Sequence, residues 1–369
     1  METARKPKPL LVVCLLVLAG MAPASQSRPA ENVIVVTLDG VRWQEVFGGA
    51  ALDLVAATEG GATDPKALAA RFWRPTPEAR REALMPFFWT FVAARGQVFG
   101  DPARASVARL TNGLWFSYPG YNELLAGVAD PRVDSNDKLP NPNVTVLEWL
   151  NGRPGFRDRV SAVGSWDVLP FIVNQARSHL QVTAEAPPFP QPENERQRLL
   201  NDVNSGLPSY WQGEWFDAIS MEAALELLRA RHPRVLYVML GETDEWAHER
   251  RYDLYLDGIV RGDRFVQRLW ETVQSLPEYK DKTALVLATD HGRGATPADW
   301  TDHGRKVPAA EPIWIGVMGP GTPPLGVRDS TTVTASQVAA TIAALVGEDF
   351  RAAEPKVAPP LPGVLGTAR

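Results

Sequence analysis

Histidine and aspartate residues occur together in three short motifs of this chain. The chain has five histidines, and three of them stand in the segments Asp244-Glu-Trp-Ala-His248, Asp290-His291-Gly292 and Trp300-Thr-Asp-His303. A fourth acidic motif, Asp39-Gly40, follows an apolar run. Carboxylate and imidazole groups are the ligands that zinc and related divalent ions prefer when no thiolate is present. The motifs therefore predict a metal site.

Each motif also has an ordinary structural interpretation. An Asp-Gly pair after a strand commonly forms a turn, and Asp244 and His248 could be a solvated pair four residues apart on one face of a helix. His179 and His232 have no aspartate partner of this kind, and we interpret them as surface or structural residues. Because three of the five histidines follow the same pattern, the combination favours metal binding.

Ser117 is the candidate nucleophile. It begins the segment Ser117-Tyr-Pro-Gly-Tyr, which is typical of a tight entry into a helix. A hydroxyl group at a helix N-terminus lies near unpaired amide groups and the positive end of the helix dipole, which favour an anionic substrate. The alternative is that Ser117 is an N-cap without a chemical role.

The elements that position these residues alternate along the chain. Four short runs rich in Val, Leu and Ile are predicted strands: Val33–Leu38, Val160–Val163, Val235–Leu240 and Ala284–Ala288. Apolar residues at helical spacing predict helices at Thr145–Leu150, Asp217–Arg231, Arg251–Ser275 and Ser336–Val346. This alternation predicts a three-layer α/β/α sandwich with a mostly parallel central sheet. The motifs follow the strands, so they should meet at the carboxyl edge of the sheet.

The chain is expected to contain one catalytic domain behind an export signal. Residues 1–24 have a basic start, the apolar run Leu10–Met21 and small residues suited to cleavage, so we expect a signal peptide. The run is too short to span a bilayer comfortably, although an uncleaved anchor is the alternative. The single cysteine, Cys14, lies in that run. Residues 29–369 form the expected domain, with helical or loop inserts near 50–100 and 181–215, and the protein is expected to be periplasmic or extracellular.

Composition restricts the class of partner. The 369 residues are 45% hydrophobic and 22% charged, and the net charge is −5. This chain can form a large core, and it has no basic excess that would favour nucleic acid. We expect a small-molecule substrate, no nucleic acid binding and no stable membrane span after signal cleavage. The oligomeric state is left open.

In this order, the motifs resemble the alkaline phosphatase superfamily, most closely its nucleotide pyrophosphatase/phosphodiesterase-like branch. The resemblance covers about residues 32–350 and implies an alkaline phosphatase-like fold with two divalent metal ions. Zinc is expected, with manganese or iron as alternatives. The implied ligands of one ion are Asp244, His248 and His303, and those of the other are Asp39, Asp290, His291 and the Ser117 oxygen.

The resemblance further implies a phosphatase or phosphodiesterase that works through a phosphoseryl intermediate. The branch usually has threonine where this chain has Ser117. Asn136 takes the place of the oxyanion-binding asparagine only with a small gap, and Lys138 is a competing phosphate contact. The alternatives are a sulfate- or phosphonate-ester hydrolase on the same fold and a catalytically silent metal-binding protein. Tyr121 stands where sulfatases need an arginine-bearing modification signal, so formylglycine formation is not expected.

Overall fold

The structure is a computed structural model that describes residue 1 and residues 29–56 and 58–366. The predicted signal peptide therefore lies outside the described residues, apart from its first residue. Among the described residues, no helix combines the length and the apolar character that crossing a membrane requires.

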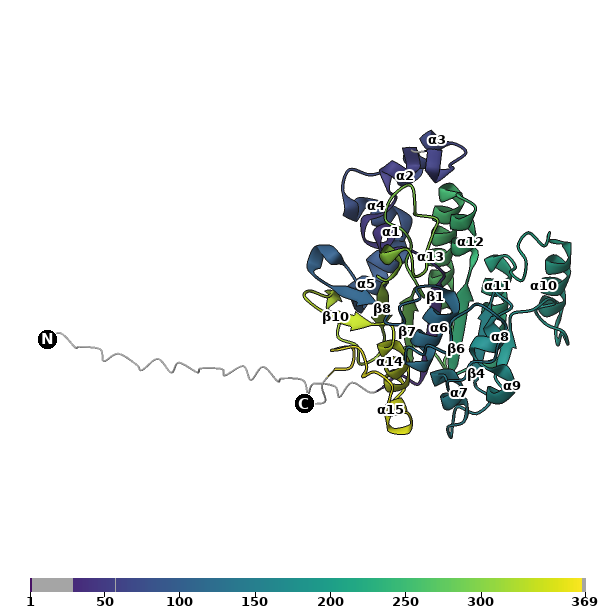
Figure 1. Cartoon of the computed structure of the whole chain (residues 1–369). Helices are drawn as coiled ribbons and strands as arrows, with labels where there is room; N and C mark the ends of the chain where they lie inside the picture. The colour runs from purple at the N-terminus through teal and green to yellow at the C-terminus, as the bar shows by residue number, and fades with distance from the viewer. Residues whose placement is uncertain (2–28, 57, 367–369) are drawn as a thin grey trace.

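An eight-stranded sheet forms the centre of the molecule (Figure 1). Its strand order is β5-β4-β6-β1-β7-β8-β2-β9. The strands are β1 (Asn32–Leu38), β2 (Gln97–Phe99), β4 (Val160–Gly164), β5 (Gln181–Thr183), β6 (Val235–Leu240), β7 (Thr283–Ala288), β8 (Ile315–Met318) and β9 (Gly326–Val327). The central strands β4, β6, β1 and β7 are mutually parallel, with Val33 opposite both Val235 and Ala284.

Strand β8 is the exception to the parallel arrangement. It pairs antiparallel with β7, Leu285 opposite Met318, and antiparallel with β2. The connection between β7 and β8, residues 289–314, leaves the carboxyl edge of the sheet and returns to it, and it carries Asp290, His291 and His303. A separate two-stranded sheet pairs β3 (Val107–Arg109) with β10 (Thr332–Thr334).

Helices cover both faces of the sheet. The α-helices used below are α1 (Trp43–Gly48), α2 (Leu52–Ala56), α3 (Pro65–Phe72), α4 (Pro77–Leu84), α5 (Ala93–Arg95), α6 (Ser117–Ala126), α7 (Val146–Asn151), α8 (Leu169–Ile172), α9 (Gln175–Ser178), α10 (Glu195–Gly206), α11 (Asp217–Arg231), α12 (Glu242–His248), α13 (Tyr252–Ser275), α14 (Gln337–Leu345) and α15 (Phe350–Ala353). Short 3₁₀ turns lie at Thr58–Gly60, Pro102–Arg104 and Pro308–Ala310, and a π-helix at Phe88–Val92.

The alternation of side chains along β1 divides the core into two layers. Ile34 and Val36 pack into the cluster that contains α11 and α13. Val33 and Val35 face the other way, into the cluster that contains α6, α7 and α14. All seven residues of β1 are buried, as expected of a strand covered on both sides. The prediction of an α/β sandwich with a mostly parallel sheet is therefore confirmed.

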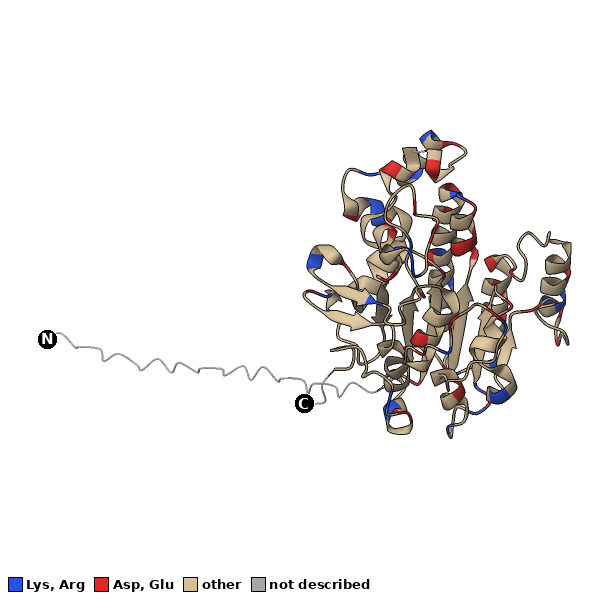
Figure 2. Cartoon of the chain, viewed as in Figure 1, with Lys and Arg blue, Asp and Glu red and all other residues tan. Residues whose placement is uncertain are grey.

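The first predicted insert, residues 50–100, is mainly helical, whereas the second, residues 181–215, contains a single α-helix. Residues 50–100 contain α2 to α5 and the π-helix, and they end in β2. Residues 181–215 begin with β5 and contain α10. In the view of Figure 2, lysine and arginine are interspersed with acidic residues over these helices.

Candidate metal centre and nucleophile

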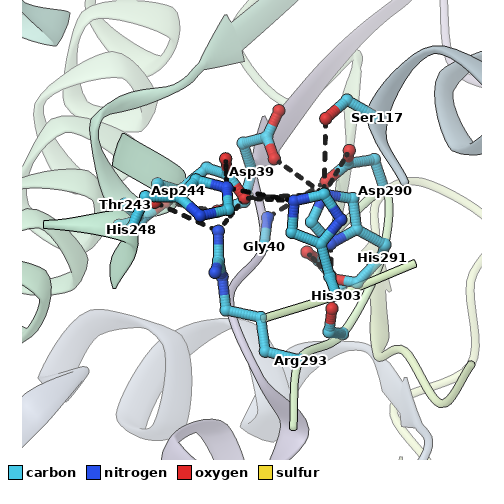
Figure 3. Close-up of polar contacts among 12 residues, drawn as sticks. Asp39, Gly40, Ser117, Thr243, Asp244, His248, Asp290, His291, Arg293 and His303 are labelled. Atoms are coloured by element: carbon cyan, nitrogen blue, oxygen red, sulfur yellow. Dashed lines mark hydrogen bonds and ion pairs between the residues drawn. The ribbon is translucent and has the colours of Figure 1, made fainter. Parts of the chain in front are cut away.

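The carboxyl edge of the parallel sheet brings the predicted ligands together (Figure 3). Asp39 directly follows β1, Asp244 and His248 lie on α12 after β6, and Asp290 follows β7. Ligand atoms of two groups lie within 4.8 Å of one another: Asp39, Asp290 and His291 form one group, and Asp244, His291 and His303 the other.

His291 lies between the two groups. Its Nε2 is 3.2 Å from Asp39 Oδ1, 3.5 Å from Asp290 Oδ2 and 3.6 Å from Asp244 Oδ1. The resemblance implied that His291 belongs to one ion only, whereas here it faces carboxylates of both. Its Nδ1 is 2.9 Å from the carbonyl oxygen of Gly292. A carbonyl only accepts, so Nδ1 donates to Gly292, and Nε2 is the ring nitrogen that faces the carboxylates.

The buried carboxyl groups of Asp39 and Asp290 both have raised pKa values. Burial, and then the nearby Asp244, raise the pKa of Asp39 well above its usual value. Burial, and then Asp39, do the same to the pKa of Asp290. Asp39 Oδ1 and Asp290 Oδ2 are buried and receive no hydrogen bond from the described residues. Lone pairs of two carboxylates and one imidazole that converge in this way fit a divalent cation bound by oxygen and nitrogen.

The second group is closer to solvent. His248 Nε2 lies 3.0 Å from Asp244 Oδ2 and 3.1 Å from His303 Nε2. The helical spacing of Asp244 and His248 thus places both on one face, as predicted. Burial, and then His291, lower the pKa of His303 to about 2, so its ring is neutral and available as a ligand.

Arg293 contributes a cation that the sequence analysis missed. Its side chain is fully buried and its guanidinium pairs with the Asp244 carboxylate and donates to the Asp244 backbone oxygen at 3.0 Å. Although burial would raise the pKa of Asp244, Arg293, assisted by His248 and His303, holds it well below its usual value. The sequence signal that could have identified Arg293 as a site residue is its position two residues after His291.

Tyr121 was also missed as a contributor to the site. Its hydroxyl donates to Asp39 Oδ2 at 2.8 Å, and Gly40 N donates to Asp290 Oδ1 at 3.1 Å. These bonds use one oxygen of each carboxylate and leave the other directed at His291. The sequence signal for Tyr121 is also its position, because a residue one helical turn after Ser117 lies on the same face of the helix.

Ser117 is the first residue of α6, and it is buried. Its Oγ lies 3.4 Å from His291 Nε2. The N-cap is Phe116, and no side chain caps this helix at that position. The interpretation of Ser117 as an N-cap is therefore wrong, because the hydroxyl points to the histidine and not to the helix amides.

The amides at the start of α6 are less available than the sequence indicated. The N–H of Tyr118 donates to Asn136 Oδ1 at 3.0 Å, and Pro119 has no N–H. This hydrogen bond places Asn136 next to the first turn of α6, one residue after Ser117. Lys138, the competing phosphate contact, pairs with Asp167 at 2.6 Å.

Glycines allow the close approach of these segments. A Cβ on Gly120 would lie 2.3 Å from the Asp290 backbone oxygen, so α6 packs directly on the start of the 289–314 connection, which we call the ligand loop. Gly292 and Gly294 follow His291, and neither has a positive φ, so turn freedom is not what requires glycine at these positions. A Cβ atom on Gly292 would lie 2.5 Å from Pro312 O, and one on Gly294 would lie 2.1 Å from Asp299 O. Any larger residue would therefore clash with the backbone at these two positions.

The two remaining histidines lie outside this cluster. His179 follows α9 and His232 follows α11, each as a left-handed C-cap residue. Both positions agree with the structural interpretation of these residues.

The fold is an alkaline phosphatase-like α/β sandwich, and at the carboxyl edge of its sheet a serine lies beside Asp and His side chains that could hold metal ions. No protein-family model matches the chain, and no curated protein matches it by sequence. Solved structures do match it. The predicted resemblance to the alkaline phosphatase superfamily is confirmed at the level of the fold.

Three solved structures illustrate the similarity. The alkaline phosphatase PafA has a TM-score of 0.58 at 10% identity, covering 92% of this chain and 99% of that one. Ps i-CgsB in complex with k-i-k-neocarrahexaose has a TM-score of 0.53 at 16% identity, covering 90% and 75%. Murine ectonucleotide pyrophosphatase/phosphodiesterase 5 has a TM-score of 0.50 at 11% identity, covering 89% and 96%.

Proposed function

We propose that this protein is a metal-dependent hydrolase of phosphate esters that uses Ser117 as its nucleophile and holds two divalent ions, with zinc expected. The observation that carries the proposal is the contact between Ser117 Oγ and His291 Nε2, at 3.4 Å, inside a cluster of buried Asp and His side chains. A serine with only a structural role has no reason to face this cluster.

The proposed reaction consists of two displacements at phosphorus. Ser117 Oγ forms a bond to phosphorus while the bond from phosphorus to the alcohol oxygen breaks, and the serine proton passes to the departing alcohol oxygen, which gives a phosphoseryl intermediate and the free alcohol. Water then attacks phosphorus, and inorganic phosphate leaves with Ser117 regenerated. When bound, the two cations would neutralise the phosphoryl oxygens and lower the pKa of the serine hydroxyl. Asp39, Asp290 and His291 would hold one ion beside Ser117, and Asp244, His248 and His303 the other.

Other side chains orient these groups. Tyr121 and Gly40 fix the Asp39 and Asp290 carboxylates through one oxygen each. Arg293 pairs with the Asp244 carboxylate and so fixes its orientation on α12. Asn136 binds the first turn of α6 through Oδ1, so its Nδ2 is available to donate to a phosphoryl oxygen. This arrangement positions the nucleophile before the substrate arrives, which is the main source of catalytic advantage in such sites.

A sulfate- or phosphonate-ester hydrolase is the second candidate, since the same cations would stabilise each reaction. The buried hydroxyl of Tyr121 is committed to Asp39, and the residue occupies the position where a sulfatase modification signal would need an arginine. This favours an unmodified serine and a phosphorus centre.

The test compares three esters of one leaving group. Metal-loaded protein should hydrolyse p-nitrophenyl phosphate or bis-p-nitrophenyl phosphate faster than p-nitrophenyl sulfate by at least about 100-fold, or about 2.7 kcal/mol in barrier. Chelation should abolish all three activities. Preference for the sulfate ester would replace phosphate by sulfate in the proposal, and no metal-dependent turnover of any ester would refute it.

A further inference from the structure

An apolar stripe on and after helix α10 stands out on the surface of the molecule. Ten large hydrophobic side chains are exposed in the part of the chain that the structure describes, and four of them lie between residues 199 and 210. They are Leu199 (60% exposed), Val203 (46%), Leu207 (38%) and Tyr210 (53%). Single exposed apolar residues need no explanation, but a row of them is typical of an interaction surface.

Helix α10 has an inner face that is packed and an outer face that is not. Gln197 and Leu200 are buried, and Leu200 belongs to the core cluster that also contains residues of α11. Leu199 and Val203 are four residues apart and so share the outer face. In Figure 1, α10 lies at the right-hand edge of the molecule, beyond α11. The apolar residues of the outer face are therefore open to a partner.

A cation and an anion flank the stripe. Arg198 and Asp202 are exposed, and they are also four residues apart, so they form a second row beside the apolar one. Neither side chain forms an ion pair within the described part of the chain, whereas the neighbouring Arg196 is paired with Glu222 and Glu226. The two charges are thus left for a contact outside the chain.

This outer face is complementary to itself. If the α10 of a second copy packs antiparallel across a two-fold axis at residue 200, Arg198 lies level with Asp202 of the second copy. The rotation keeps the charged row of both helices on the same side, so the opposite charges meet twice, as an isologous interface requires. Leu199 then lies between Leu199 and Val203 of the second copy, with the helix axes about 8–10 Å apart.

Other occupants suit this face less well. A bilayer with anionic headgroups would be repelled by Asp202 and Glu195, which outnumber Arg198 on the exposed side of the helix. An unrelated protein would have to supply a row of opposite charges in the same register. A second copy of this chain already carries that row.

We propose that the outer face of α10 is a homodimer interface in which the two helices pack antiparallel and Arg198 pairs with Asp202 of the second copy. The inference does not depend on the proposed function of Ser117. Helix α10 has 12 residues and is about 18 Å long, so the contact is smaller than the about 1,200 Å² of stable specific interfaces. We therefore expect a dissociation constant weaker than about 1 µM, and a monomer at the lower concentrations used in kinetic and unfolding assays.

Sedimentation velocity over a range of protein concentrations tests the proposal. The wild type should show a reversible monomer–dimer equilibrium. Leu199→Glu and Arg198→Asp should each weaken the dimer by at least about tenfold, because one buries a charge and the other places like charges together. The double variant Arg198→Asp/Asp202→Arg restores opposite charges across the two-fold axis and should return the dissociation constant to that of the wild type. These positions are exposed, so all the variants should fold.

A matched control and a vesicle experiment complete the test. Leu325→Glu changes an apolar residue that is exposed to a similar degree, 54%, but lies outside α10, and it should leave the dimer unchanged. A monomer at every concentration, or a dimer that the α10 variants do not weaken, would overturn the inference. So would failure of the double variant to restore the dimer. Co-sedimentation of the monomer with phosphatidylcholine/phosphatidylglycerol vesicles, lost in Leu199→Glu, would replace the second copy by a membrane surface. All of these results leave the proposed ester hydrolysis untouched, because none of them measures turnover.

Discussion

At the scale of single residues, the proposed reaction depends on the Ser117 hydroxyl group, whose Oγ lies 3.4 Å from His291 Nε2. Ser117→Ala removes the covalent route but leaves Asp39, Asp290 and His291 in place. We expect kcat to fall by at least about 1,000-fold, or about 4 kcal/mol, while metal content stays unchanged. Steady-state kinetics and metal analysis on the same sample check this. Ser205→Ala, in α10, is the control, and near-normal turnover in Ser117→Ala would remove the serine from the mechanism.

Arg293 forms a buried ion pair with Asp244, so replacing it should affect both the stability of the fold and the charge of the site. Arg293→Met leaves the Asp244 carboxylate without its buried partner, and breaking such a pair costs about 3–5 kcal/mol. A bound cation can replace the lost charge, so the variant should gain more thermal stability from added Zn²⁺ than the wild type does. Melting temperatures with and without metal measure this.

The control for this variant is an exposed ion pair. Arg104 and Asp329 are both largely exposed, and pairs of that kind contribute about 0–1 kcal/mol. Arg104→Met should therefore show the same rise in melting temperature on addition of Zn²⁺ as the wild type. If Arg293→Met also showed the wild-type rise, the Arg293 guanidinium would not be neutralising the charge of Asp244.

At the scale of elements, the packing of α6 on the ligand loop sets the position of the nucleophile. Gly120→Ala should favour the helix itself by about 1 kcal/mol, but the new Cβ would lie 2.3 Å from the Asp290 backbone oxygen. We expect the clash to displace α6 and lower kcat at least tenfold. Gly206→Ala, in α10, has no atom within 4 Å of its new Cβ and should be neutral. Equal activity in both variants would contradict this packing argument.

Helix α13 is tied to the π-helix by a buried carboxylate. Phe87 N and Phe88 N donate to Asp263 at 2.9 and 2.8 Å, yet burial raises the pKa of Asp263 to about 6. A raised folded-state pKa means that stability is greatest below the unfolded value of about 3.9 and is lost as the pH rises through about 6. This loss is up to about 3 kcal/mol.

Replacing that carboxylate tests the pH dependence. Asp263→Asn cannot ionise, so its stability relative to the wild type should improve between pH 4 and pH 7. Urea unfolding at several pH values measures the difference. Asp202→Asn, at an exposed site in α10, is the control and should show no such trend. A pH-independent difference between Asp263→Asn and the wild type would mean that Asp263 does not ionise in this range.

Local patterns predicted the central elements because burial dictates their composition. The continuous apolar runs at Val33–Leu38 and Val235–Leu240 gave strands close to the observed bounds. Strand β8 was not predicted although Ile315–Met318 is fully buried, because three apolar residues and a glycine after a long loop have no periodicity of their own. Helix α6 was recognised only from its motif, since glycine and proline in its first turn are poor helix formers.

At the scale of the whole molecule, the topology of the sheet makes a site from distant residues. Three parallel strands end at one edge, so residues 39, 244 and 290 meet there although they are far apart in sequence. The motifs therefore predicted which residues lie together. They could not predict that His291 faces both groups or that Arg293 pairs with Asp244, because those contacts depend on how the 289–314 connection packs against α12.

The most direct test of the central claim is detection of the phosphoryl group on Ser117. Metal-loaded protein is mixed with p-nitrophenyl phosphate, quenched in acid at short times, digested and analysed by mass spectrometry. The account predicts one phosphorylated peptide that contains Ser117, absent from chelated protein and from Ser117→Ala. Metal-dependent turnover with no phosphorylation of Ser117 at any time, and with Ser117→Ala fully active, would contradict it.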